Sequence, residues 1–301
     1  MVVSLWPVLA LSVAVLVWGT TFVVSSDALS AASPAALTVA RFAIAALVLL
    51  PLAVRRTGFA AALGSPRSAL LGLTGVAAYY GLQNAGLLYT TAGTAALLQA
   101  GLPLATVALA ATFLGERPGP AAAFGLLLAT AGVVLIAGAE LARLNLGALL
   151  VIGGVLAYAV YTVQLRGQPR ADPLVLSTAT CVWGLAFLLP WQLWEVATGR
   201  AGFDMRVSLL VAVTYLGVVA SAGTLVLWTY GAARLSATTA GAFTAAIPAV
   251  GYALAVLTGE EPSLLKLAGS ALALVGTAVV TVAARRQQLA EPVRPPRKPN
   301  G

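Results

Sequence analysis

The sequence has no histidine, one cysteine and few charged residues, and each shortage excludes a kind of chemistry. Only 9% of the 301 residues are charged, compared with about 25% in an average soluble domain. Without histidine, the chain cannot carry a Ser-His-Asp triad or His-based acid–base catalysis. The single Cys181 rules out an internal disulfide and, with no histidine present, a Cys/His metal site. We therefore expect a protein that is not an enzyme and needs no metal or cofactor.

Long apolar runs fill most of the chain, of which 60% is hydrophobic. A helix of about 20 apolar residues crosses the roughly 30 Å hydrocarbon core of a bilayer and satisfies its own backbone groups there. The sequence therefore predicts an all-α polytopic membrane protein with ten transmembrane helices. The expected spans are residues 5–26, 34–54, 68–89, 91–114, 120–138, 146–165, 173–194, 208–233, 236–258 and 264–284.

The two halves of the chain carry the same pattern. Residues 89–136 and 234–281 each hold two apolar segments joined by a Gly-Glu turn. Three glycines of the first half recur 144 residues later in the second: Gly115, Gly125 and Gly132 match Gly259, Gly269 and Gly276. Five spans per half is an odd number, so the two repeats must be inverted in the membrane. The predicted units are residues 1–138, a linker 139–145, residues 146–284, and a disordered basic tail 285–301.

The basic residues predict the orientation. Four of the 17 Lys and Arg residues fall in one set of alternate loops, Arg41 lies inside a span, and the remaining twelve fall in the other set and the tail. By the positive-inside rule both termini are expected in the cytoplasm, in a multi-pass protein of the plasma membrane. The net charge of +8 is then expected to meet the lipid bilayer and not nucleic acid. The first span could instead be a signal peptide, but residues 1–5 lack Lys and Arg, and we prefer the membrane helix.

Short motifs in both halves resemble the drug/metabolite transporter superfamily, in its ten-helix branch with two EamA-type repeats. The residues that carry the resemblance are the motifs at 18–22 (WGTTF), 40–42 (ARF), 89–98 (YTTAGTAALL), 114–117 (LGER), 237–242 (ATTAGA), 247–248 (IP) and 258–260 (TGE). The resemblance implies a ten-helix transporter of small molecules, with amino acids and other metabolites among the substrates and export preferred. The sequence departs from the pattern in the sixth span, where Ala157-Tyr158 stands in place of Trp-Gly, so we expect an asymmetric cavity.

Polar and aromatic side chains inside the spans are the candidate lining of a substrate cavity, because polar groups in hydrocarbon are costly. Thr and Ser in membrane helices commonly bond their own backbone or join helices, whereas buried amides and tyrosine hydroxyls need partners and can equally line a pathway. The candidates are Trp18, Tyr79, Tyr80, Gln83, Asn84, Gln99, Tyr158, Tyr161, Trp228 and Thr244.

Arg41 and two matched prolines have two interpretations each. Arg41 is the one ionisable residue well inside a predicted span. It could bind a substrate carboxylate, or it could snorkel or bond backbone carbonyls as a structural anchor, and we prefer the structural role. Pro103 and Pro248 each remove a helix hydrogen bond and are either hinges or static kinks.

An uncharged pocket of this kind suits small neutral or zwitterionic metabolites, and amino acids are the favoured class. The predicted spans offer no carboxylate or histidine relay for protons and no Walker A motif, so we expect substrate-driven export, exchange or facilitated passage. Efflux of drugs or other organic compounds is an alternative, and a lipid-handling protein or non-transporting scaffold is another. The oligomeric state stays open, a monomer being compatible with this architecture.

Overall fold

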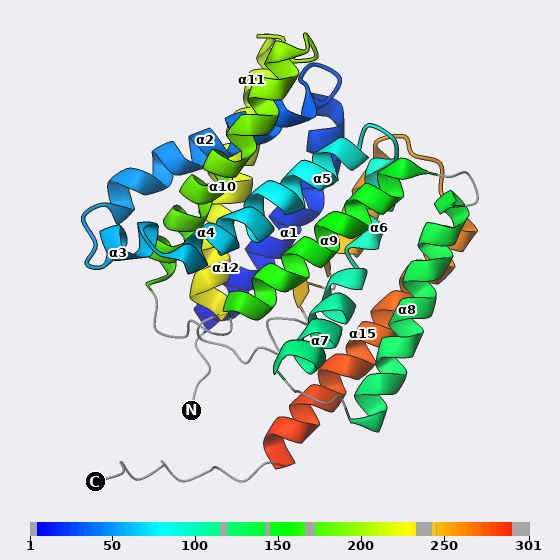
Figure 1. Ribbon diagram of the computed structural model, residues 1–301. Coiled ribbons are helices and arrows are strands. Elements are labelled where there is room, and N and C mark those ends of the chain that lie inside the picture. Colours follow the sequence, from blue (N-terminus) through cyan, green and yellow to red (C-terminus); the bar gives the residue numbers. More distant parts are fainter. Residues whose placement is uncertain are drawn as a thin grey trace, which may run out of the picture.

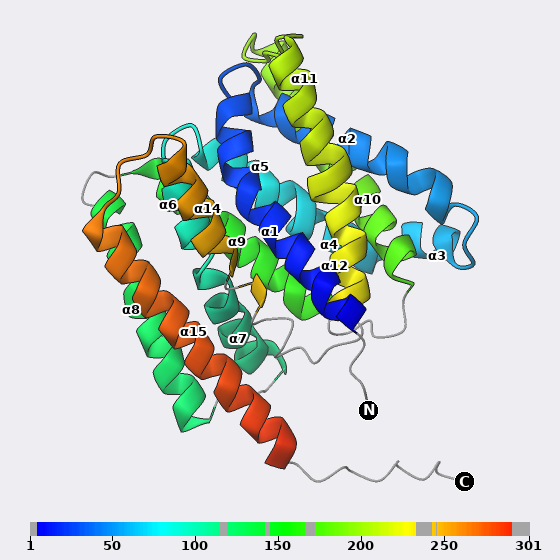
Figure 2. The same cartoon turned by 180° about the vertical axis from the view of Figure 1, so that it is seen from behind.

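The computed structural model describes residues 5–114, 119–141, 145–165, 172–232, 243–244 and 246–290, and these residues are almost all helical. Within them no strand is present, only the isolated bridge between Ala32 and Phe203. Figures 1 and 2 show the helices from two sides. The elements are α1(Leu5–Ala28), α2(Pro34–Ala53), α3(Phe59–Leu63), α4(Pro66–Gly72), the π-helix η1(Leu73–Ala78), α5(Tyr79–Gly86), α6(Ala92–Leu98), α7(Gly101–Leu114), α8(Pro120–Leu141), α9(Leu146–Leu165), α10(Pro173–Ala197), α11(Val207–Thr214), the π-helix η2(Tyr215–Gly223), α12(Thr224–Ala232), α14(Ala246–Leu257) and α15(Leu264–Ala290).

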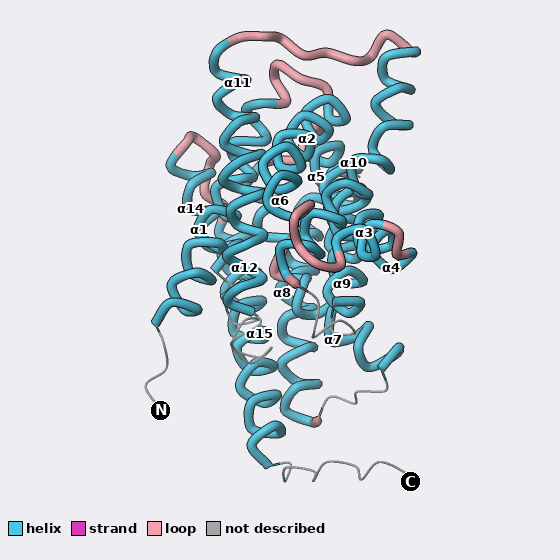
Figure 3. The backbone as a smooth tube through the Cα atoms, turned by 90° about the vertical axis from the view of Figure 1, so that its left-hand side faces the viewer, coloured by secondary structure: helices cyan, strands magenta, loops and turns pink. Residues whose placement is uncertain are grey.

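The all-α membrane fold predicted from the sequence is confirmed. Six helical segments of the described residues are long and apolar enough to cross a bilayer: residues 5–28, 34–53, 92–109, 146–165, 173–197 and 207–228. Shorter apolar helices at 120–132, 246–257 and 264–276, with the rod formed by α4, η1 and α5, complete the ten spans. Large apolar side chains cover the outside, among them Leu47, Leu127 and Phe124, as a lipid solvent requires. In Figures 1 to 3, α1 begins and α15 ends on the same side, as an even number of spans demands.

Proline and glycine set several helix ends where the sequence predicts them. α2 begins at Pro34 after Ser33, and α10 begins at Pro173 after Asp172, whose side chain accepts a hydrogen bond from the backbone N–H of Leu174 at 2.9 Å. Gly259 follows the end of α14 with φ +112°, a conformation that L side chains rarely adopt. Its counterpart Gly115 lies outside the described residues.

The fourth span is present as predicted but is interrupted, because residues 91–114 do not form one continuous helix. α6 ends at Leu98 and α7 begins at Gly101. The cause is Pro103, which has no N–H to give to the carbonyl of Gln99 four residues before it. That carbonyl instead accepts from the backbone N–H of Leu102 at 2.9 Å. In the other half, Pro248 lies close to the first described residues of α14.

A tight seam between α8 and α15 relates the two repeats. These helices lie side by side in all three ribbon and tube views. A Cβ on Gly132 would come within 2.5 Å of the carbonyl oxygen of Gly269, and a Cβ on Gly276 within 2.5 Å of the carbonyl oxygen of Gly125. Gly276 and Gly269 lie 144 residues after Gly132 and Gly125, so each contact is the repeat-related copy of the other and the seam is self-complementary. The matched glycines therefore let the last helices of the two repeats pack backbone against backbone.

Adding one methyl group at this seam should loosen the molecule. We expect Gly132→Ala and Gly276→Ala each to lower the stability by about 1–3 kcal/mol, because the new Cβ meets backbone that cannot move aside. Gly153→Ala in α9 is the control, since its Cβ would meet only Leu82 at 3.4 Å. The measurement is the apparent melting temperature of the purified protein in detergent. Equal melting temperatures for all three variants would show that the seam does not hold the halves together.

Candidate substrate-binding site

A row of aromatic rings crosses the middle of the molecule from α2 to α9. Neighbouring ring centroids are 4.6 to 5.0 Å apart, within the range of favourable aromatic pairs. The row consists of Phe42, Tyr80, Tyr79, Tyr158 and Tyr161 in that order. It joins the first half of the chain to the second at the contact between Tyr79 and Tyr158. We call these five residues the aromatic row.

Contacts of Tyr79 with Gln99 and of Tyr161 with Gly75 fix the position of the aromatic row. Tyr79 also donates its hydroxyl hydrogen to Oε1 of Gln99 at 3.1 Å, which brings the break between α6 and α7 to the row. Tyr161 lies directly on Gly75 of η1, where a Cβ would come within 2.4 Å of the tyrosine ring. The tyrosines therefore occupy a space that a glycine on the opposite helix leaves open.

A second group of contacts, here called the arginine network, begins at Arg41 on α2. Its Nε donates to Oγ of Ser221 at 2.7 Å and its Nη2 donates to the carbonyl of Ala220 at 3.2 Å. The same carbonyl accepts from the hydroxyl of Thr224 at 2.8 Å, and Thr224 accepts from Nε1 of Trp18 at 2.9 Å. The network thus ties α1 and α2 of the first half to η2 and α12 of the second.

The two groups meet at Tyr80. The guanidinium carbon of Arg41 lies 4.3 Å from the centroid of the Tyr80 ring, close enough for a cation–π contact. Arg41 is completely buried, so of the two structural alternatives it does not snorkel to the membrane surface but bonds a backbone carbonyl. Its contact with the backbone of η2 still gives it an anchoring role, but one inside the protein.

Most of the predicted cavity residues belong to these two connected groups or lie next to them. Trp228 packs on Trp18 with ring centroids 5.1 Å apart. Asn84 and Gln83 are buried beside the groups on α5, and Asn84 donates to Oγ1 of Thr38 at 2.8 Å. Thr244 lies in the short described stretch before α14. The candidates that the structure brings together are Trp18, Arg41, Tyr79, Tyr80, Gln99, Tyr158, Tyr161 and Trp228.

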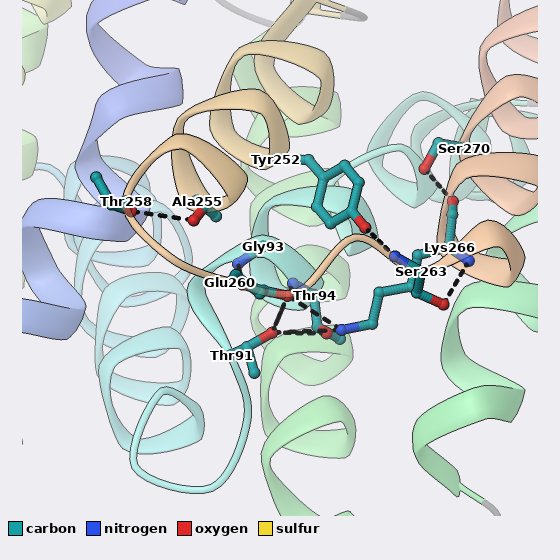
Figure 4. A network of polar contacts seen from close by, with 10 residues as sticks. All are labelled: Thr91, Gly93, Thr94, Tyr252, Ala255, Thr258, Glu260, Ser263, Lys266 and Ser270. Carbon is teal, nitrogen blue, oxygen red and sulfur yellow. Dashed lines mark hydrogen bonds and ion pairs between the residues drawn. The ribbon is translucent and has the colours of Figure 1, made fainter.

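Loops after α1, α5, α10 and α14 share one face of the molecule, at the top of Figure 1, which we call the upper face. There Glu260, from the second half, binds the start of α6 in the first half (Figure 4). Its carboxylate accepts from the backbone N–H of Gly93 at 2.8 Å and from the hydroxyl of Thr91 at 2.7 Å, and pairs with Lys266 at 3.1 Å. An anion is favoured at a helix N-terminus, and only glycine at position 93 leaves room for this one.

A second carboxylate on the upper face acts in the same way. Glu195 near the end of α10 is buried, accepts a hydrogen bond from the hydroxyl of Ser33 and another from the backbone N–H of Ala35 at 3.4 Å. It therefore binds the start of α2. Beside it, the backbone N–H of Asp204 donates to the carbonyl of Ala31 at 2.8 Å. The polar contacts of Glu260, Glu195 and Asp204 thus hold the two halves together on this face. The sequence did not reveal these partners, which lie more than 150 residues apart.

An open groove between α7, α8 and α9 is less suited to a polar ligand. It has a volume of about 270 Å³ and is lined almost wholly by apolar side chains such as Leu104, Leu126 and Leu156. Leu156 is among the large exposed apolar residues of the exterior, which the bilayer covers. We therefore place the candidate site at the two buried groups and not in this groove.

Two inverted repeats around a buried group of polar and aromatic side chains are an architecture of secondary transporters. The EamA-like transporter family model matches residues 5–138 and 145–282, so this chain belongs to the EamA-like transporter family. It is a multi-pass membrane transporter.

Individual relatives agree with this assignment. A "Probable terminal-alkyne amino-acid exporter" of Streptantibioticus cattleyicolor is 33% identical over 95% of this chain and 97% of its own length. An "Uncharacterized transporter" of Archaeoglobus fulgidus is 29% identical over 91% and 98% of the two chains. A solved crystal structure is similar with a TM-score of 0.67 and 26% identity, over 93% of this chain and 99% of that one.

Removing the charge of Glu260 should weaken the upper face. We expect Glu260→Gln to lower the apparent melting temperature, since it replaces charge-assisted bonds and one ion pair at a cost on the order of 2 kcal/mol. Glu261→Gln is the matched control, because its side chain is exposed at the next position. If both variants have the same melting temperature as the wild type, the carboxylate of Glu260 does not hold α6 in place.

Proposed function

We propose that this transporter exports small neutral or zwitterionic metabolites, amino acids first among them, by alternating access. The observation that carries the proposal is the buried meeting of the aromatic row and the arginine network, between the two halves. Rings supply apolar surface, while Gln99, Asn84 and Ser221 supply uncharged hydrogen-bonding groups in one place. The name of the relative from Streptantibioticus cattleyicolor supports amino acids as the class and export as the direction.

The orientation part of the proposal places both termini in the cytoplasm of a cell whose plasma membrane holds the protein. The upper face is then external. The bonds of Glu195 and Glu260 close that face between the halves, so export requires them to break. Pro103 in α7 and Pro248 in α14 are the proposed hinges for that movement.

The energy source in this proposal is the substrate gradient or exchange. Within the described spans, acidic side chains occur only near helix ends, as Asp27 in α1 and Glu195 in α10. The buried centre therefore offers no carboxylate that would carry a proton across with the substrate.

Flux through proteoliposomes tests the function. Vesicles holding purified protein are loaded with a labelled amino-acid mixture, and release is followed with and without a proton gradient. We expect saturable release that Tyr158→Ala and Gln99→Ala reduce at least about tenfold, because each removes a group of the buried site. Leu156→Ala, on the exposed side of α9, should leave release unchanged.

Three results would contradict parts of the proposal. No release of any amino acid would move efflux of other organic compounds to first place. Release that a proton gradient accelerates would contradict the substrate-driven mechanism. If Tyr158→Ala and Leu156→Ala reduced amino-acid release to the same extent, the binding site would lie elsewhere.

A further inference from the structure

Arg41 keeps one guanidinium nitrogen without a partner inside the protein. Nε and Nη2 are bound by Ser221 and Ala220, whereas Nη1 is buried and forms no hydrogen bond within the described residues. No acidic side chain of that part of the chain pairs with Arg41. A charge buried with only neutral acceptors is expensive, and a free donor on it adds to the cost. Such a nitrogen is suited to receive an anionic group from a ligand.

Asn84 presents the complementary atom. Thr38 donates its own hydroxyl hydrogen to the carbonyl of Pro34 at 2.6 Å, so toward Asn84 it can only accept. The amide nitrogen of Asn84 must therefore face Thr38, which fixes the orientation of the amide. Its oxygen Oδ1 points away from Thr38 and is buried without a hydrogen-bond partner. A buried acceptor of this kind is suited to a ligand's ammonium group.

The two unpaired atoms, Nη1 of Arg41 and Oδ1 of Asn84, lie on successive turns of the packed helices α2 and α5. Thr38 and Arg41 are three residues apart on α2, and Asn84 and Tyr80 are four residues apart on α5, so each pair shares one face of its helix. Thr38 contacts Asn84 and Arg41 stacks on Tyr80. Successive turns of a helix are about 5.4 Å apart, which brings the cationic donor and the neutral acceptor within about one turn of each other.

We propose that Arg41 and Asn84 recognise the two charged ends of an α-amino acid. Nη1 of Arg41 donates to the carboxylate, and Oδ1 of Asn84 accepts from the ammonium group. The ligand's side chain then lies along the aromatic row, beginning at Tyr80, which is already in contact with Arg41. This assignment rests on the proposed transport of amino acids and adds the atoms that recognise them.

Arg41 serves two purposes in this arrangement. Its Nε and Nη2 hold η2 of the second half against α2, which keeps the guanidinium plane fixed on the Tyr80 ring. The remaining nitrogen is thereby aimed before the ligand arrives. A carboxylate bound at Arg41 therefore contacts the same side chain that joins α2 of the first half to η2 of the second.

A panel of ligands with altered ends tests the assignment on the unaltered protein. The probes are L-phenylalanine, its carboxamide, its N-acetyl derivative and 3-phenylpropionate, with the corresponding leucine series as a second side chain. Binding is measured from ligand-induced shifts in melting temperature in detergent. We expect the carboxamide to bind at least about tenfold more weakly than the amino acid, because a neutral amide oxygen replaces the anionic carboxylate as the partner of Arg41.

Variants assign each end to its residue. Asn84→Leu should abolish the preference for L-phenylalanine over its N-acetyl derivative and keep the preference for the acid over the carboxamide. Gln192→Leu is the control, since Gln192 also carries a buried unpaired oxygen but lies near the end of α10. Arg41→Gln should bring acid and carboxamide to equal affinity. Should that variant fail to fold, the ligand panel on the wild type still decides.

Each outcome separates this assignment from the proposed function. Amino acids that are transported while their carboxamides bind equally well overturn the role of Arg41 and leave amino-acid export standing. Binding of 3-phenylpropionate as tight as that of L-phenylalanine, with no amino-acid flux, overturns amino-acid export and the role of Asn84 but supports the carboxylate site. If no member of either series binds, the assignment is wrong.

Discussion

The buried guanidinium of Arg41 is the interaction around which the centre of this transporter is arranged. A positive charge with no carboxylate partner among the described residues must be stabilised by neutral groups. Ser221, the carbonyl of Ala220 and the ring of Tyr80 provide that stabilisation from three directions. Through these contacts one side chain of α2 holds both the π-helix η2 and the beginning of the aromatic row. The candidate site and the junction of the two halves therefore depend on the same residue.

Symmetry and asymmetry have separate places in the fold. The seam between α8 and α15 is symmetric, since the contacts of Gly132 and Gly276 are equivalent, and it joins the two halves away from the site. The centre is asymmetric, because Arg41 and the tyrosines of the third and sixth spans have no equivalents in the opposite half. Each half nevertheless has a π-helix in its third span: η1 lies in the third span of the chain and η2 in the eighth. π-Helices are frequent at functional sites, and here η1 carries the glycine under Tyr161 and η2 carries the oxygens that bind Arg41.

Much of this fold could be predicted from the sequence because its causes are local or periodic. Apolar length predicts the spans, and the 144-residue repeat predicts two halves. Pro103 indicates a disturbance of the fourth span, although only the structure shows that it separates two helices at Gln99. The polar and aromatic residues chosen for their position in hydrocarbon are largely those that the structure gathers at its centre.

The remaining features depend on which distant segments meet, and composition does not specify that. Gly93 and Glu260 stand in two separate motifs, and nothing in either motif shows that one binds the other. The sequence also leaves open whether Arg41 snorkels or is buried, since a snorkelling side chain and a buried one have identical sequence context. The π-helices likewise have no signal in the apolar periodicity of their spans.

A structure determined with an amino acid bound, in a lipid nanodisc, tests the account most directly. The account predicts a ligand carboxylate within hydrogen-bond distance of Nη1 of Arg41, the ammonium group at Asn84, and the ligand side chain on the aromatic row. It also predicts that Arg41 keeps its bonds to Ser221 and Ala220 in that state. A ligand bound elsewhere, with Nη1 of Arg41 paired to a carboxylate of the protein, would contradict the account.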